Sequence, residues 1–238
     1  MSQSTGGPCL VCGKEALTRC QACGKAGISL FFCSKEHQRV LWPVHKLVCG
    51  PSANPFTFPG LSQGEADEAK RNLDVPFPME GGESVKRTDM LDFIDGLVPG
   101  HPSNYNALTP AYQQYCLILV RATRHARLIL TGWRPTTPID ILCTASFILT
   151  ACCITPIYNG ADKPIPTWHH FFTHLLLTNL SLHRAYDLTS SPTVRSELEG
   201  TMISSFQRMV DFAQSEVRAV DPTAADRIVA VVADDGLL

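Results

Sequence analysis

The sequence lacks the segments that would mark a membrane or secreted protein. Its most apolar run, residues 141–154, is interrupted by threonine and serine. It is also shorter than the roughly 20 apolar residues that a membrane-spanning helix needs. Residues 1–8 lack the basic-then-apolar layout of a secretory signal. We therefore expect no membrane partner and an intracellular protein, cytoplasmic or nuclear, whose cysteines remain reduced.

Several familiar catalytic motifs and any strong charge bias are also missing. The sequence contains no GxGxxG fingerprint, no P-loop and no nucleophile elbow. The net charge is −2, and residues 1–50 hold six lysines or arginines against two glutamates. The basic charge of this first segment is too modest to predict nucleic-acid binding by itself.

What the sequence does contain is a dense cluster of cysteine and histidine in residues 9–49. Six of the ten cysteines and two of the eight histidines lie there, in four closely spaced pairs: Cys9 with Cys12, Cys20 with Cys23, Cys33 with His37, and His45 with Cys49. A two-residue gap suits a knuckle turn, and a three-residue gap places both side chains on one helical face. Eight ligands fill two tetrahedral sites and leave no place for a catalytic water. The pattern therefore predicts two structural zinc ions, and it favours zinc over disulfides.

Metal binding also explains how so short a segment could fold. About 40 residues with few core residues between the ligands cannot fold on hydrophobic burial alone. Zinc binding would supply most of the folding free energy, so chelation is expected to unfold the segment. The spacing by itself leaves open which pairs share an ion.

The stretch FCSKEHQRVLWPVHKLVC closely resembles the second half of a MYND-type zinc finger. The shared features are Phe32-Cys33-Ser34, Gln38, Trp42, His45-Lys46 and Cys49, all at the family's spacing. His37 stands where the family usually has cysteine, and histidine is a competent zinc ligand. The resemblance covers about a fifth of the chain.

The resemblance implies a cross-braced finger in which the ligand pairs alternate between two ions. The first zinc would be held by Cys9, Cys12, Cys33 and His37. The second would be held by Cys20, Cys23, His45 and Cys49.

Gln38 and Trp42 are not ligands, but they lie four residues apart and so share a helical face. One hypothesis is that Trp42 anchors the core of a domain too small to do without it, and for this residue we favour that hypothesis. The other is that both residues line a groove for a partner protein or proline-rich peptide, as the resemblance implies.

The rest of the chain is expected to be a linker followed by an all-α domain. Residues 51–86 are rich in proline and glycine, which predicts a partly extended linker with one short helix near 65–72. From residue 87 to 238, a capping residue followed by proline recurs four times and marks helix starts. The expected helices are 88–97, 110–131, 138–154, 167–188, 192–219 and 222–233.

Two further functions compete with a zinc-binding protein-interaction module. A metal-dependent enzyme could use His169, His170 and His174, but a helical wheel places His170 and His174 on the polar face, where we expect solvent. Nucleic acid could bind the basic finger together with Arg121, Arg124 and Arg127, although these arginines lack interleaved aromatic residues and we expect them to be solvated.

A SET-type methyltransferase is a special case, because some MYND fingers interrupt such a β-rich catalytic domain. Only eight residues precede Cys9, and no Asn-His-x-Cys stretch is present. We therefore expect no enzyme. The finger, residues 1–50, is expected to act in an adaptor-like or regulatory role.

Overall fold

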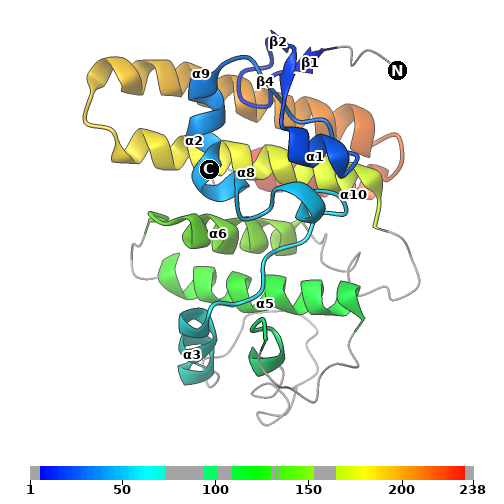
Figure 1. Cartoon of the computed structure of the whole chain (residues 1–238), viewed down its shortest axis with the longest axis vertical. Helices are drawn as coiled ribbons and strands as arrows, with labels where there is room; N and C mark the ends of the chain where they lie inside the picture. The colour runs from blue at the N-terminus through cyan, green and yellow to red at the C-terminus, as the bar shows by residue number, and fades with distance from the viewer. Residues whose placement is uncertain are drawn as a thin grey trace.

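The computed structural model describes residues 6–72, 94–100, 109–129, 132, 134–152 and 165–233. Residues 6–49, called the finger here, lie against a stack of long helices, called the helical body (Figure 1). This arrangement confirms the expected fold class, a small finger followed by an all-α domain. Every helix in the described part of the chain is too short or too polar to span a bilayer.

The finger consists of two small antiparallel ladders and two helices. Strand β1 (Gly7–Pro8) pairs with β2 (Glu15–Ala16), and β3 (Thr18–Arg19) pairs with β4 (Phe31–Phe32). Helix α1 (Gln21–Lys25) lies between the second pair of strands, and α2 (Lys35–His45) follows β4. The side chain of Ser34 caps α2 by accepting a hydrogen bond from the backbone N–H of His37.

The helical body contains two helix pairs that pack on each other. Helix α5 (Pro110–Ile129) pairs with α6 (Pro138–Ala151), and α8 (Thr167–Leu188) pairs with α9 (Pro192–Phe212). Contacts between α6 and α8 join the pairs (Figure 1). A π-helical turn, η2 (Ala213–Val217), follows α9 and packs against α10 (Pro222–Ala233).

Four of these helices begin at the expected proline, each after a capping side chain. In each case a side-chain oxygen accepts a hydrogen bond from the backbone N–H three residues later; the capping residues are Thr109, Thr137, Ser191 and Asp221. Of the expected helix 88–97, only residues 94–97 lie within the described part of the chain.

The segment after the finger contains the short helix expected near residues 65–72, but it packs on the helical body and is not a free spacer. A short 3-10 helix, η1 (Gly50–Ser52), leads into a stretch whose Phe56, Phe58 and Leu61 are buried. The stretch crosses in front of α6 and α5 in Figure 1, and the backbone of Phe58 bonds to Gln114 of α5 before the chain reaches α3 (Gln63–Arg71). Proline and glycine suggested a spacer, but the apolar side chains between them anchor the segment to the helical body. Residues 73–86 of the expected linker lie outside the described residues.

The arginines of α5 are not solvated, contrary to expectation. Arg121 is 1% exposed, and its Nε donates to Glu65 Oε1 at 3.0 Å. Arg124 donates from Nε to Glu68 and from Nη1 to Asp140, both partners lying within 3.1 Å. Helix α3 therefore covers the face that the helical pattern assigned to solvent. These guanidinium groups hold α3 against α5 and α6, so they give the nucleic-acid alternative no support.

Candidate metal centres and the helix between them

The first cysteine and histidine cluster joins the β1–β2 ladder to the start of α2. Cys9 and Cys12 lie on the turn between β1 and β2, Cys33 follows β4, and His37 lies in the first turn of α2. Cys33 Sγ lies 3.2 Å from His37 Nδ1 and 3.5 Å from Cys12 Sγ. Cys9 Sγ lies 3.5 Å from the same imidazole nitrogen.

The second cluster joins α1 to the end of α2. Cys20 and Cys23 flank the start of α1, His45 is the last residue of α2, and Cys49 follows it. Cys49 Sγ lies 3.5 Å from Cys20 Sγ and 3.7 Å from Cys23 Sγ. His45 Nε2 lies 3.5 Å from both of those sulfurs.

Both clusters have the chemistry and the dimensions of a zinc site. Zn–S bonds of about 2.3 Å and Zn–N bonds of about 2.0 Å in a tetrahedron place sulfurs about 3.8 Å apart, and a sulfur and a nitrogen about 3.5 Å apart. The four ligand atoms of each cluster lie within 4.8 Å of one another, and the close pairs approach these ideal separations. The grouping is the alternating one that the resemblance implied. All four positions of each site are filled by protein, so neither site has an open position for substrate.

The ionisation of the ligands also suits a bound cation. Burial raises the pKa of Cys9, but backbone N–H groups of Cys12, Cys33 and Val11 outweigh it and lower the pKa to about 6. Burial and the neighbouring thiols raise the pKa of Cys33 to about 12. Three thiolates so close together need a positive charge between them, and a divalent zinc ion supplies it. Burial lowers the pKa of His45, which keeps the imidazole neutral, as a metal ligand must be.

Comparison with known proteins agrees with this geometry. Residues 9–49 match the MYND finger family. Egl nine homolog 1 of Mus musculus is 40% identical over 76 residues, which cover 26% of this chain and 18% of that protein. Egl nine homolog 1 of Homo sapiens is 44% identical over 103 residues, which cover 37% of this chain and 22% of that protein. The chain thus spans about a fifth of the length of these relatives. No solved structure matches the chain.

Residues 9–49 are therefore a MYND-type zinc finger, a protein-interaction module that binds two zinc ions.

Helix α2 carries Gln38 and Trp42 between its two zinc ligands. Gln38 is half-buried, whereas the side chain of Trp42 is 46% exposed, with its ring centroid 6.1 Å from that of His45. The hypothesis that Trp42 anchors the core of the finger is therefore wrong. That hypothesis treated the finger as free-standing. In the structure α2 packs against α8 and α6, and its Leu41 and Val44 are buried in a core that the finger shares with the helical body.

The histidines of α8 are buried, not solvated as the helical wheel suggested. His170 Nδ1 accepts a hydrogen bond from the backbone N–H of Phe56 at 2.9 Å, and His174 Nε2 lies 3.2 Å from the carbonyl oxygen of Ala53. Their ring nitrogens thus hold the segment after the finger. Among the described residues, the groups of side chains able to hold a metal are the two clusters of the finger. The α8 histidines therefore give the metal-enzyme alternative no support.

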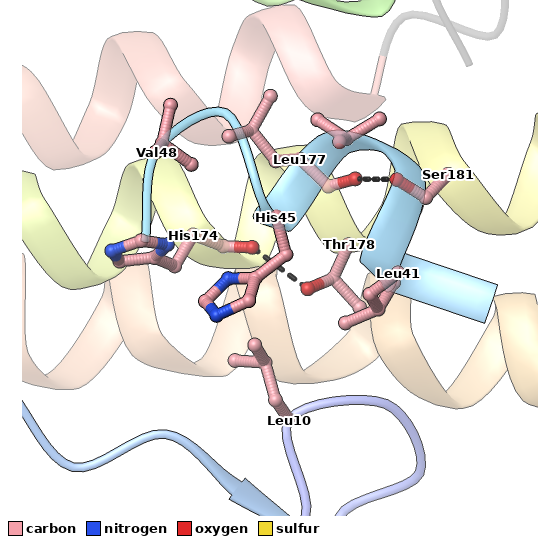
Figure 2. Close-up of a pocket in the computed structure, with 9 residues that line it drawn as sticks. Leu10, Leu41, His45, Val48, His174, Leu177, Thr178 and Ser181 are labelled. Carbon is pink, nitrogen blue, oxygen red and sulfur yellow. Dashed lines mark hydrogen bonds between the residues drawn. The ribbon is translucent and has the colours of Figure 1, made fainter. Parts of the chain in front are cut away.

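The finger and α8 meet in a tight interface (Figure 2). Leu10, Leu41 and Val48 of the finger surround His45 there, with His174 and Thr178 on the α8 side. The cavity between them is only about 10 Å³, which is at the lower limit for one water molecule. Sequence patterns had no signal for this interface, because its two sides are more than a hundred residues apart.

Proposed function

We propose that the protein is an adaptor or regulatory protein that captures a partner peptide on the exposed face of α2. The observation that carries this proposal is the exposure of Trp42, which is 46% exposed on a helix that carries a zinc ligand near each end. Trp is among the residues most often responsible for binding energy in protein interfaces. An exposed indole on a rigid helix loses little conformational entropy when a partner covers it.

The neighbouring Gln38 adds polar recognition to this apolar surface. It lies one helical turn before Trp42 and is half-buried, so its side chain is partly held in place before a partner arrives. Its amide both donates and accepts hydrogen bonds, as required for binding the backbone of an extended peptide. Proline-rich segments suit such a site, because they are already extended and expose free carbonyl groups to aromatic surfaces.

We assign the helical body the role of a scaffold without catalytic activity. Its buried histidines bind backbone groups, and its arginines bind the carboxylates of α3 and α6. We also propose a reducing compartment, such as the cytoplasm or nucleus, because the six cysteines of the finger are grouped as zinc ligands and must stay reduced to bind the metal.

Peptide binding by variants of α2 tests this function. Short proline-rich peptides are screened with the wild-type protein, and the affinity of the strongest binder is then measured for Trp42→Ala and Gln38→Ala. Trp42→Ala should weaken binding at least about tenfold, and Gln38→Ala should weaken it by a smaller factor. Both variants should retain two zinc ions per chain.

A matched control removes another exposed apolar side chain of the finger. Leu17 is 79% exposed and lies between β2 and β3, not on α2. Leu17→Ala should bind the peptide as the wild type does. Unchanged affinity in Trp42→Ala would overturn the assignment of the α2 face.

A further inference from the structure

A side chain of the helical body reaches the first zinc cluster. Arg208 of α9 donates hydrogen bonds from Nη1 to the carbonyl oxygen of Cys9 and, at 2.8 Å, to that of Leu10. Arg208 and Cys9 are 199 residues apart in the sequence. The two carbonyl groups belong to the turn that carries Cys9 and Cys12. Arg208 therefore hydrogen-bonds to the backbone that positions two ligands of the first zinc ion.

The turn is also shaped to receive this side chain. Gly13 ends it with a φ of +74°, a conformation that L-residues with a side chain rarely adopt. A Cβ atom at Gly13 would lie 3.0 Å from Cδ of Arg208. Glycine at position 13 therefore allows the backbone conformation of the turn and leaves room for the side chain of Arg208 beside it.

The charge of Arg208 complements that of a loaded site. Three thiolates and a neutral imidazole around one Zn²⁺ leave a net charge of about −1. In the part of the chain that the structure describes, Arg208 forms no ion pair with a carboxylate, and the nearby thiols of Cys9 and Cys12 are its electrostatic partners. A partly buried guanidinium without a carboxylate is stabilised when a negative cluster lies beside it.

We propose that Arg208 is a positioning residue for the first zinc ion, so that α9 controls how tightly the finger holds that ion. It fixes the Cys9–Cys12 turn through two carbonyl groups and offsets the net charge of the filled site. The second cluster has no such contact with α9 among the described residues, so the effect is selective for one of the two ions.

Zinc release from the full-length protein tests this role. Arg208→Gln keeps a polar side chain but removes the charge and the guanidinium, and Arg208→Lys keeps the charge without the guanidinium. The control is Arg195→Gln, which removes an exposed arginine at the other end of the same helix. Zinc is titrated with a competing chelator, and alkylation of cysteines followed by mass spectrometry identifies the cluster that opens.

Arg208→Gln should weaken one zinc ion about 10- to 100-fold, the usual effect of removing a partner that orients metal ligands. Cys9, Cys12 and Cys33 should become reactive while Cys20, Cys23 and Cys49 stay protected. Arg208→Lys should restore part of the loss, and Arg195→Gln should match the wild type.

If Arg208→Gln weakened the binding of both zinc ions equally, the cause would be general destabilisation, and the proposal would be overturned. It would also be overturned if the variant released both ions to the chelator as the wild type does. If Arg208→Gln does not fold, Arg208→Lys provides the second test, because it keeps the charge but loses the guanidinium that contacts the turn. Arg208→Lys should hold the first zinc ion more weakly than the wild type, with Cys9, Cys12 and Cys33 more reactive, and wild-type protection of all six cysteines would overturn the proposal.

Discussion

His45 of the finger and His174 of α8 lie with their ring centroids 6.2 Å apart, at the point where the second zinc cluster meets the helical body. His174 also packs against the ring of Phe56, 5.2 Å away, and its Nε2 bonds to the carbonyl group of Ala53. One buried side chain of α8 therefore contacts a zinc ligand and the segment that leaves the finger.

Replacing His174 with alanine should destabilise the protein by about 3 kcal/mol, because a buried ring and a hydrogen bond to a buried carbonyl group are both lost. Urea unfolding monitored by circular dichroism measures this loss. The control is His183→Ala on the same helix, where the half-buried side chain should cost on the order of 1 kcal/mol. Equal losses in both variants would contradict a special role for His174.

His37 should be replaceable by cysteine but not by alanine. His37→Cys supplies another zinc ligand at the same position, so two zinc ions per chain should remain. His37→Ala leaves the first cluster with three protein ligands and should release one ion. Metal analysis after dialysis against a weak chelator distinguishes these outcomes, and two retained ions in His37→Ala would remove His37 from the site.

The stability of the protein should fall in mild acid because α8 buries neutral histidine. Burial lowers the pKa of His169 to about 3 from its ordinary value of 6.5. A histidine with a lowered pKa in the folded state contributes stability above pH 6.5 that is lost as the pH falls toward 3. Between pH 7 and pH 5 the loss should be about 2 kcal/mol for this residue.

His169→Leu should reduce the slope of stability against pH, whatever it does to stability at pH 7. Urea unfolding of wild type and variant at both pH values, with excess zinc present, measures the slope. Identical slopes would show that His169 contributes nothing to the acid sensitivity.

The ion pair between Arg121 and Glu65 should be far more important to stability than an exposed pair. Its partners are 1% and 8% exposed, so Arg121→Met leaves a buried carboxylate and should cost about 3–5 kcal/mol. The double variant Arg121→Met/Glu65→Met removes both charges and should recover part of that loss. Arg218→Met breaks the exposed pair with Asp226 and should cost less than about 1 kcal/mol. Denaturant unfolding of the four proteins gives the comparison.

Much of the fold could be predicted because its determinants are local. The starts of α6 and α9 each depend on a hydrogen bond between a side-chain oxygen and a backbone N–H only three residues later. The capping residues Thr137 and Ser191 therefore predict these starts from the sequence. The zinc clusters are similar, since each ligand pair is set by a turn or a helical spacing within four residues. Which pairs share an ion depended on the family resemblance, because it requires contacts more than twenty residues apart.

The burial of side chains on a helix face, in contrast, could not be predicted from the sequence, because it depends on which distant element covers that face. A helical wheel describes one helix in isolation, and it could not reveal that residues 53–58 cover His170 and His174, or that α3 covers Arg121. Trp42 was expected to be buried and is exposed, again because of a distant element. The helical body supplies the core that a free-standing finger would have needed from its own tryptophan.

The sequence by itself determined the two zinc sites' ligand types, the helical body and the helix starts, since each follows from chemistry acting over a few residues. Only the tertiary structure decided that the finger is joined to the body. The finger, the segment after it and α3 are each fixed to the body by contacts between distant residues. These are Cys9 with Arg208, 199 positions apart, Phe56 with His170, 114 apart, and Glu65 with Arg121, 56 apart. Such contacts form only when the whole chain packs its apolar surface together, and no local pattern encodes which faces then meet.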